Sequence, residues 1–290
     1  MKTLILRNMA EVEKALELSG SRKINFIPTM GNLHDGHFAL IREAKKNRNI
    51  NLVSIYVNPL QFNDIKDLDN YPRSLDKDLK NLTELGVSMV YLPEKAFNLN
   101  NTSTIHLGEI VNKLCGKIRK GHFEGVATII LKFLLIIKPE QIYLGEKDFQ
   151  QILVIKKIIK DFNFDVKVIT IPTIRGPGGI ALSSRNQRIK NINNLKKIYE
   201  CLCKIKIKIN EDNFYMKDLE YFKDDLIKSG ICKVNYLEIL RESDLAELTS
   251  VPSRCRIFIS CNIEGVNVID NLGLIKKVSF KEGGKLKTSS

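Results

Sequence analysis

Short apolar runs alternate with amphipathic helical patterns along roughly the first 170 residues of the chain. Apolar runs bounded by polar turns predict buried strands at 23–29, 52–58, 88–93, 141–145 and 166–173. Helical patterns lie between them at 37–47, 74–86, 125–138 and 148–163. Because strands that alternate with helices of this length form βαβ units, the pattern predicts an α/β fold with a doubly wound parallel sheet.

The pattern changes at the turn RGPGG, residues 175–179, whose glycines and proline indicate a hinge or linker. Helices are expected beyond it at about 186–209 and 214–229, and strands at 234–240, 254–263 and 266–274. These strands follow one another without helices, which predicts an antiparallel sheet. We therefore expect two domains, residues 1–175 and a smaller α+β domain of residues 176–290, with a frayed tail at 281–290.

Composition narrows the class of protein only a little. Lys and Arg number 46 against 33 Asp and Glu, a formal net charge of +13 that would suit a phosphate-rich partner. The lysines are spread over both halves and there is no Trp, so we expect no nucleic-acid partner. The six cysteines include no C-x-x-C pair and are expected to be free thiols.

No segment of the sequence is expected to enter a membrane. The longest apolar stretch, residues 126–137, is interrupted by Lys132 and is too short for a span. The first 16 residues turn into a charged amphipathic helix and carry no signal-peptide pattern. These features predict a cytoplasmic protein.

Polar loops follow four of the predicted strands, at 30–37, 58–63, 145–151 and 175–186. In doubly wound sheets, ligands bind beyond the carboxyl ends of the strands. The candidate chemistry should therefore lie in these loops.

The first loop holds His34 and His37, half of the four histidines in the chain. It leads from a strand into a helix, whose unpaired N–H groups and positive dipole end favour phosphate. Gly31 and Gly36 would let the backbone approach such an anion closely. The alternatives are a capped turn with two solvated histidines, or a zinc site that takes further ligands from elsewhere in the chain.

Lys147 is a compact cation that suits phosphate. Asp148 could accept a hydrogen bond from a ribose hydroxyl or bind magnesium. A plain loop with an acidic helix cap would explain the same residues. Gln150 and Gln151 open the following helix, so one of them should face the site.

Ser183, Ser184 and Arg185 combine two hydroxyls with a guanidinium, a set that binds phosphate oxygens well. Asn186 is a possible helix cap, and the same stretch would also serve as an N-terminal capping box without any ligand.

Two more segments carry polar groups at the ends of predicted elements. Asn58 and Gln61 follow a buried strand, and neutral amides can bind hydroxyls and a carboxylate without adding charge. Arg119, Lys120 and His122 precede a buried helix and form another phosphate-compatible helix start. The sequence has neither a G-x-S-x-G motif nor a G-x-x-x-x-G-K-[ST] loop, which argues against a serine hydrolase and a P-loop ATPase.

Six segments, taken in order, resemble the pantothenate synthetase (pantoate–β-alanine ligase) family: PTMGNLHDGH, VSIYVNPLQFN, YPRSLDKDL, GHFEGVATII, YLGEKDFQQ and ALSSRN. The resemblance runs from about residue 24 to 190 and weakly beyond. It implies a Rossmann-like core of the H-x-G-H nucleotidyltransferase superfamily, whose fold is related to class I aminoacyl-tRNA synthetase cores. Such an enzyme adenylates pantoate, releasing pyrophosphate, and then joins the pantoyl group to β-alanine, giving pantothenate and AMP.

The resemblance also implies roles for single residues. It places His37, His34 and Lys147 in catalysis, and Gln61 and Gln151, with Asn58 and Arg119, at pantoate and β-alanine. It further implies Mg²⁺ with ATP, with unassigned ligands, and a homodimer. Because ALSSRN lies just past the RGPGG turn, we also expect the second domain to act as a lid. The implied ATP-binding residues are Met30, Gly31, Asn32, Leu33, His34, Asp35, Gly36, His37, Gly145, Glu146, Lys147, Asp148, Ile174, Leu182, Ser183, Ser184 and Arg185.

The chain departs from the family pattern at three places. Lys120 stands where the family commonly has proline, and RGPGG replaces an acidic READG, which predicts a more mobile loop or weaker ATP binding. The run SLDKDLKN is less acidic than usual and leaves Asp76 and Asp78 as weak metal candidates.

Two other functions stay open at this point. Another H-x-G-H adenylyltransferase, acting on a nucleotide or phosphopantetheine, would need neither Gln61 and Gln151 nor a substantial second domain. A nucleic-acid-binding module that kept a synthetase-like core would need a clustered basic face with aromatic side chains.

Overall fold

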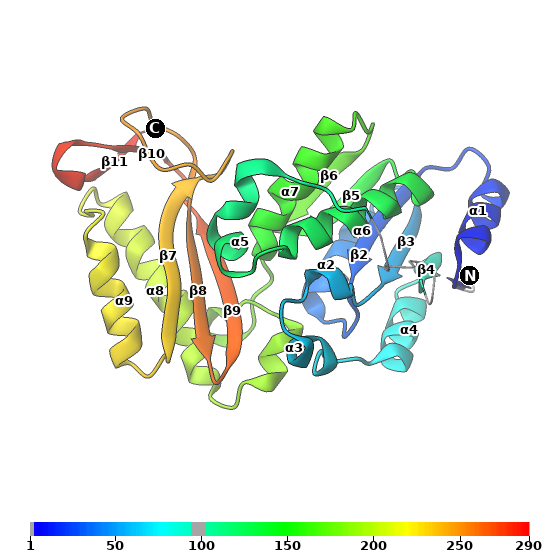
Figure 1. Cartoon of the computed structure of the whole chain (residues 1–290), viewed down its shortest axis with the longest axis horizontal. Helices are drawn as coiled ribbons and strands as arrows, with labels where there is room; N and C mark the ends of the chain where they lie inside the picture. Colours follow the sequence, from blue (N-terminus) through cyan, green and yellow to red (C-terminus); the bar gives the residue numbers. More distant parts are fainter. Residues whose placement is uncertain (1–2, 94–102, 290) are drawn as a thin grey trace. The chain divides into compact units, whose positions relative to one another are not determined.

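The computed structural model describes residues 3–93 and 103–289, and the chain forms two compact units. Unit 1 comprises Met1–Asn112 and Arg119–Ile174, and unit 2 comprises Lys113–Ile118 and Arg175–Ser290. Figure 1 shows the elements of both units. Within the described residues, no helix is long and apolar enough to cross a membrane.

Unit 1 is built on a sheet of six described strands, all paired in parallel. The order is β1-β4-β3-β2-β5-β6, so the chain runs outward from β2 in one direction and from β5 in the other. The topological switch point, where ligands of such sheets bind, therefore lies between β2 and β5. The strands are β1 (Leu4–Leu6), β2 (Ile24–Thr29), β3 (Ile50–Ile55), β4 (Met89–Tyr91), β5 (Gln141–Gly145) and β6 (Lys167–Ile171).

Helices cover both faces of this sheet, which confirms the predicted doubly wound α/β fold. Ile27 and Val53 pack with buried residues of α2 and α4, whereas Phe26, on the opposite face, meets Phe133 of α6 at 5.3 Å between ring centroids. The strand β1 was not predicted, because its three residues, which directly precede a helix, are too few to show the alternation of a strand. The helices are α1 (Met9–Leu18), α2 (Asp35–Ala44), α3 (Ile65–Asp69), α4 (Leu75–Glu84), α6 (His122–Ile137) and α7 (Phe149–Asp161).

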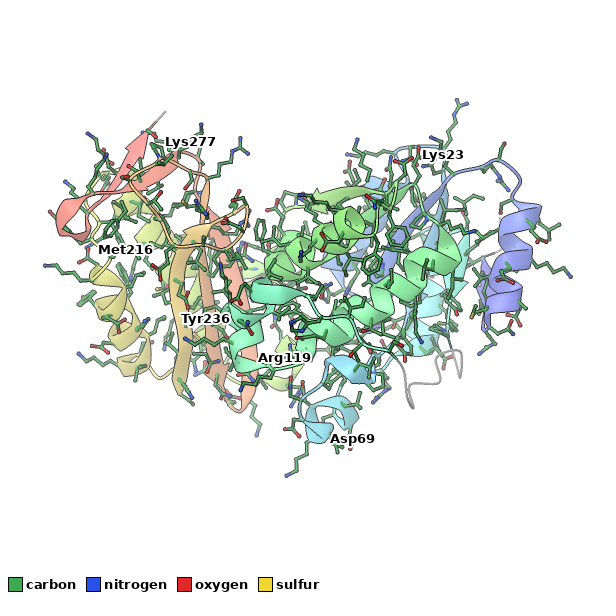
Figure 2. The ribbon with its side chains drawn as sticks, turned by 45° about the horizontal axis from the view of Figure 1, so that its top comes forward. Lys23, Asp69, Arg119, Met216, Tyr236 and Lys277 are labelled. Carbon is green, nitrogen blue, oxygen red and sulfur yellow. The ribbon has the colours of Figure 1, made fainter. Side chains whose placement is uncertain are left out.

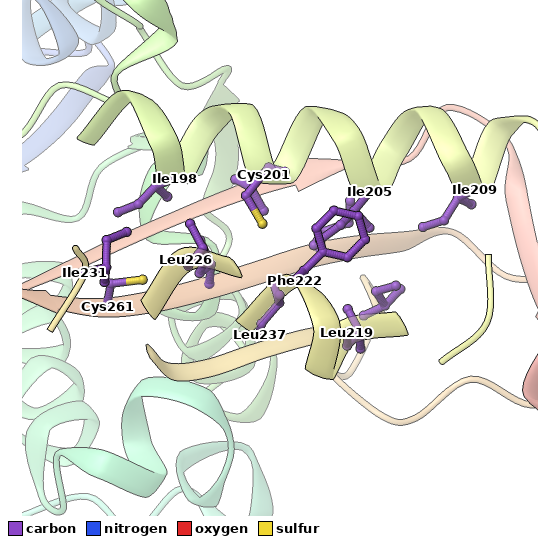
Figure 3. Close-up of a cluster of buried hydrophobic side chains, with 14 of the residues drawn as sticks. Ile198, Cys201, Ile205, Ile209, Leu219, Phe222, Leu226, Ile231, Leu237 and Cys261 are labelled. Carbon is purple, nitrogen blue, oxygen red and sulfur yellow. The ribbon is translucent and has the colours of Figure 1, made fainter. Parts of the chain in front are cut away.

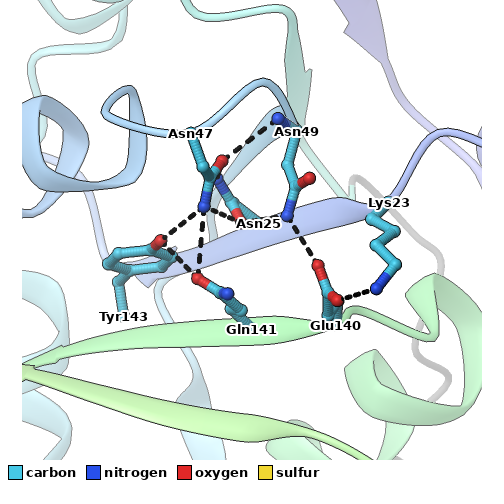
Figure 4. A network of polar contacts seen from close by, with 7 residues as sticks. All are labelled: Lys23, Asn25, Asn47, Asn49, Glu140, Gln141 and Tyr143. Atoms are coloured by element: carbon cyan, nitrogen blue, oxygen red, sulfur yellow. Dashed lines mark hydrogen bonds and ion pairs between the residues drawn. The ribbon is translucent and has the colours of Figure 1, made fainter.

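A network of amides ties the amino ends of β2 and β5 together (Figure 4). Asn25 is fully buried and donates to Ala44 O at 2.7 Å and to Asn51 Oδ1 at 2.9 Å. Asn47 reaches Gln141 Oε1 and Tyr143 Oη, both at 3.3 Å. This network stabilises the edge of the sheet opposite the candidate loops, because each buried amide finds a partner.

Unit 2 carries the predicted antiparallel sheet, in the order β7-β8-β9 (Lys233–Arg241, Cys255–Ile263 and Val266–Gly273). The helices α8 (Ile192–Asn210) and α9 (Asp218–Lys228) share a core with it, and α5 (Leu114–Ile118) belongs to the same unit. In Figure 3, the α8 residues Ile198, Cys201, Ile205 and Ile209 line one face at helical spacing. Burial raises the pKa of Cys201 to about 12, so this free thiol stays protonated.

Two local predictions for unit 2 were wrong. The tail predicted to fray from residue 281 is ordered over its described residues, because β11 (Leu286–Ser289) pairs with β10 (Lys277–Phe280) and buries Leu286 completely. The helix predicted from about 186 begins only at Ile192, with Asn191 as its cap, and Asn186 instead donates to Ala181 O at 2.9 Å.

The turn RGPGG packs on α8 in unit 2. Arg175 makes a bidentate ion pair with Asp270, at 2.7 and 2.9 Å, and its guanidinium lies 4.3 Å from the centre of the Tyr199 ring. A Cβ added at Gly179 would come within 1.8 Å of Tyr199, so only glycine fits this close approach.

Candidate active site

The candidate site of unit 1 lies at the carboxyl ends of β2, β3 and β5, around the topological switch point. The loop 30–34 leaves β2 and enters α2 at Asp35. The loop after β5 forms a single 3₁₀ turn, Glu146–Asp148, before α7. Two of the four predicted loops therefore flank the topological switch point between β2 and β5.

His34 and His37 cap the N-terminus of α2 with their own side chains. Gly36 N donates to His34 Nδ1 at 3.1 Å, and His34 N donates to His37 Nδ1 at 3.3 Å, which is a capping box built from two histidines. A backbone N–H can only donate, so Nδ1 of each ring is an acceptor. In the neutral imidazole, the proton then lies on Nε2 of both rings.

Gly36 is needed for this arrangement. Its missing side chain leaves room for the His34 ring, since a Cβ there would lie 2.8 Å from His34 Cε1. The two rings consequently pack at 4.1 Å between centroids. Glycine is thus required here by the histidine cap itself, in addition to any approach of a ligand.

Both histidines are neutral near pH 7. Burial, reinforced by the proximity of His34, lowers the pKa of His37 to about 3. Burial and the charge of Lys147 lower the pKa of His34, while the Asp148 carboxylate opposes the shift. The influence of Lys147 and Asp148 on both rings also shows that the loops after β2 and β5 come together.

The loop after β5 presents a cation beside a carboxylate. Lys147 Nζ lies 3.4 Å from Asp148 Oδ1, and 18% of the lysine side chain is exposed against 51% of the aspartate. In the following helix, Gln150 is buried and donates to Ile110 O at 2.9 Å. Gln151, the next residue, is half-buried. Of the two glutamines, Gln150 is the one whose side-chain amide is held by a backbone carbonyl.

Asn58 and Gln61 form a buried amide pair after β3. Asn58 Nδ2 donates to Gln61 Oε1 at 3.2 Å and to Gly125 O at 3.1 Å, and Asn58 Oδ1 accepts from Leu60 N at 3.1 Å. Gln61 Nε2 lies 2.7 Å from Met30 Sδ. The structure thereby joins the amide pair to the histidine loop.

Arg119 and His122 hold the backbone of Gln61. Arg119, labelled in Figure 2, donates to Gln61 O at 2.9 Å, and His122 Nδ1 lies 2.7 Å from the same oxygen. Because a carbonyl only accepts, His122 carries its proton on Nδ1 and accepts from Arg119 at Nε2, 3.3 Å away. This tautomer is the opposite of the one at His34 and His37.

Five other predicted ATP-binding residues lie at the end of unit 1 or in unit 2. Ile174 is the last residue of unit 1, whereas Leu182, Ser183, Ser184 and Arg185 belong to unit 2. There Ser183 Oγ accepts from Arg185 N at 3.3 Å and caps the 3₁₀ helix Ser184–Arg188. The structure thus confirms that this stretch caps a helix, and the cap leaves its proposed contact with ATP untested.

Asp78 was considered only as a weak metal candidate, and its contacts are different. It is 1% exposed and accepts from the backbone N–H groups of Asn32 and Leu33. Its spacing of four residues from the buried Leu82 could have revealed an acid on the inner face of α4. Within residues 3–93 and 103–289, no group of three or more His, Cys, Asp or Glu could hold a metal ion.

Comparison with known proteins gives consistent results. A family model described as Pantoate-beta-alanine ligase matches residues 4–273. The pantothenate synthetase of Thermoanaerobacter pseudethanolicus is 37% identical over 275 residues, covering 92% of this chain and 96% of the relative.

Solved structures agree with this match. Pantothenate synthetase from Thermus thermophilus superposes with a TM-score of 0.84 at 29% identity, covering 94% of this chain and 99% of that one. Pantoate-beta-alanine ligase from Francisella tularensis, complexed with β-γ ATP and β-alanine, has a TM-score of 0.80 at 37% identity, covering 93% and 97%. The similarity thus extends over both units.

Proposed function

The chain belongs to the pantoate–β-alanine ligase family, and from this premise we propose that unit 1 binds ATP at the start of α2 and pantoate beside Gln61. As a member of the family, the enzyme joins pantoate to β-alanine and forms pantothenate. The observation that carries the proposal is the histidine cap of α2, which directs two Nε2–H donors away from the helix backbone.

The proposed reaction has two steps. A pantoate carboxylate oxygen attacks the α-phosphorus of ATP, a P–O bond forms, and pyrophosphate leaves. The β-alanine amine then attacks the acyl carbon of pantoyl adenylate, AMP leaves, and the amide forms as the amine loses a proton. The first step joins two anions, so positioning and stabilisation of charge should supply most of the rate enhancement.

Neutral histidines suit this role. With pKa values lowered by burial, His34 and His37 would donate hydrogen bonds from Nε2 to phosphate oxygens without having to release a proton. Lys147 would supply the positive charge, and the N-terminal dipole of α2 would add to it. We therefore assign charge stabilisation, rather than proton donation, to His37.

Pantoate is proposed to lie against the amide pair. Gln61 is held at three points, by Asn58 at its side chain and by Arg119 and His122 at its carbonyl. A preorganised amide can bind the hydroxyl and carboxylate of pantoate at little entropic cost. Gln151 would complete the pantoate site and Gln61 would also lie near β-alanine, as the family resemblance implies.

Magnesium is proposed to arrive with ATP, held mainly by the phosphates. Mg²⁺ commonly binds through substrate phosphates, one or two carboxylates and water, and this mode needs no cage of protein ligands. The described residues offer no such cage, but Asp148 lies beside Lys147 at the proposed phosphate site. Its carboxylate is the ligand we assign to the ion.

The family resemblance supports one further part of the proposal, contacts with ATP by Gly145, Glu146, Ile174, Leu182, Ser183, Ser184 and Arg185. The position of the Ser-Ser-Arg motif just past the RGPGG turn supports another, that residues 176–290 act as a lid. The division of the chain into domains at residue 175, the homodimer and the cytoplasmic location likewise stay predictions.

A coupled assay of pyrophosphate release tests the proposed reaction. With ATP and pantoate alone, we expect release of about one pyrophosphate per active site, and with β-alanine we expect continuous turnover that yields AMP. Replacing pantoate with a nucleotide or phosphopantetheine should give no release. Release that does not depend on pantoate would contradict the proposal.

A further inference from the structure

We propose that Asp78 is a positioning residue that sets the conformation of the histidine loop for adenylation. The inference rests on the proposed function, since it concerns the loop to which that proposal assigns ATP. Asp78 lies on α4, outside the loop, and none of its hydrogen bonds goes to the side chains of His34, His37 or Lys147. It would act through the backbone of Asn32 and Leu33.

Both carboxylate oxygens of Asp78 are engaged by the loop. Oδ2 accepts from Asn32 N at 2.7 Å and Oδ1 accepts from Leu33 N at 2.9 Å. The Ser74 hydroxyl lies 3.1 Å from Asp78 Oδ1 and 3.2 Å from Asn32 Oδ1. Hydrogen bonds to a carboxylate are stronger than those between neutral groups. The Asp78 side chain is also almost completely buried, so water does not compete for these contacts.

The loop adopts a conformation that needs such support. Gly31 and Asn32 both have positive φ, at 81° and 49°, a left-handed region that costs energy at a non-glycine residue. The successive N–H groups of Asn32 and Leu33 point at one carboxylate, and concavities lined by backbone N–H groups in turns bind anions. Here the anion is the carboxylate of Asp78 itself.

This contact changes which donors remain for ATP. The N–H groups of Asn32 and Leu33 point at Asp78, so any contact of these two residues with ATP would have to come from other atoms. Phosphate binding is left to the start of α2, the histidine Nε2–H groups and Lys147. The internal carboxylate therefore fixes the loop before ATP arrives, which lowers the cost of ordering it on binding.

Removing the charge should displace the loop. In Asp78→Asn, the amide nitrogen would face one of the two N–H donors, so one buried donor would lose its partner. His34 follows Leu33 directly, and a displacement of about 1 Å at a catalytic group can cost about 10²-fold in rate. Pantoate binding should change little, because Gly125, Arg119 and His122 hold Asn58 and Gln61 from outside the loop, which contacts Gln61 only through Met30 at its start.

The experiment compares Asp78→Asn with Glu84→Gln, an exposed acid at the end of the same helix. Steady-state pyrophosphate release is measured at a temperature at which circular dichroism shows each protein folded. We expect kcat of Asp78→Asn to fall at least ~10-fold, with KM for pantoate within ~2-fold of wild type. Glu84→Gln should match wild type in both constants.

Histidine NMR gives a readout that does not require activity. The chain has four histidines, so the ¹⁵N spectrum of the imidazoles is simple. We expect Asp78→Asn to shift the signals of His34 and His37 and to leave that of His106 in place.

If Asp78→Asn does not fold, Ser74→Ala is the milder variant. We expect it to show a smaller fall in kcat and an unchanged KM for pantoate.

A folded Asp78→Asn variant with unchanged kcat and unchanged His34 and His37 signals would overturn the inference, even if its melting temperature fell. The same holds if Ser74→Ala, used in its place, leaves kcat and both signals unchanged. If wild type released no pantoate-dependent pyrophosphate, the proposed function would fail instead, and the NMR comparison would still test Asp78.

Discussion

His34 and His37 set their own chemistry through local contacts. Each ring accepts from a backbone N–H at Nδ1, so the helix start that they cap also determines their tautomer. Burial keeps both rings neutral, and neutral Nε2–H groups are suited to hydrogen bonding with phosphate oxygens. At this scale, the histidine pair serves as the cap of a helix and as the candidate catalytic group at once.

Replacing His37 should separate these two roles. His37→Ala is expected to lose ~10²–10³-fold in the rate of pyrophosphate release, because one preorganised donor to the developing charge is gone. The fold should persist, since a lost cap interaction costs only about 1 kcal/mol. His106→Ala, at an exposed histidine, is the matched control. A rate near that of wild type in His37→Ala would refute the assignment.

The lowered pKa of His37 also predicts a dependence of stability on pH. Its pKa is about 3 in the folded protein against about 6.5 in an unfolded chain. Between these values the unfolded state binds more protons, so this histidine destabilises the fold as pH decreases below 6.5, by at most about 1.4 kcal/mol per pH unit. Above pH 6.5, where His37 is neutral in both the folded and the unfolded chain, it does not change the stability with pH.

Urea unfolding at about pH 5 and about pH 7.5 checks this expectation. His37→Gln keeps a side-chain acceptor suited to the capping box and removes the titrating group. Wild type should therefore lose more stability on acidification than His37→Gln does. Equal losses in the two proteins would mean that His37 titrates normally in the folded state.

Among the elements, α6 positions the amide pair after β3. The helix comes closest at Gly125, where an added Cβ would lie 2.2 Å from Leu60 O and 2.9 Å from Gln61 N. The helix and the 3₁₀ turn Pro59–Gln61 therefore meet backbone to backbone. The same helix start brings His122 to the carbonyl of Gln61.

The Gly125→Ala variant tests this contact. The added methyl group should push the Pro59–Gln61 turn away, raising KM for pantoate at least ~10-fold and costing about 1–3 kcal/mol of stability through overpacking. KM for ATP should change much less. Leu135→Ala, on the exposed side of the same helix, serves as the control, and equal effects of the two variants would refute the proposed contact with pantoate.

The whole molecule consists of two units, each with a core of its own. In unit 1 the core lies on both faces of the parallel sheet, and in unit 2 it joins α8 and α9 to β7–β9. The family match from residue 4 to 273 spans both, which confirms the resemblance inferred from the six motifs. The proposed ATP-binding residues are likewise divided between the two units.

Hydrogen exchange tests whether both units respond to substrate. With pantoate and a non-hydrolysable ATP analogue, we expect slower exchange at 31–37 in unit 1 and at 182–185 in unit 2. The hairpin of β10 and β11, which holds no proposed ligand residue, is the internal control. Protection confined to unit 1 would contradict the proposed roles of Ser183, Ser184 and Arg185 and the predicted lid.

The amino-acid sequence alone was enough to predict the fold class, the family and most of the loops of the candidate site. Hydrophobic periodicity is local, so it located five strands of the parallel sheet and three of the antiparallel one, and short motifs located the histidine loop. It did not reveal β1, β10 or β11, because short strands depend on pairing with distant residues for their stability.

The contacts of the side chains in the site became visible only in the folded chain. Asp78 lies 46 residues along the chain from Asn32, and Gln61 lies 61 residues from His122, so no local pattern connects them. The neutral state of the histidines depends above all on burial, which the packed tertiary structure provides.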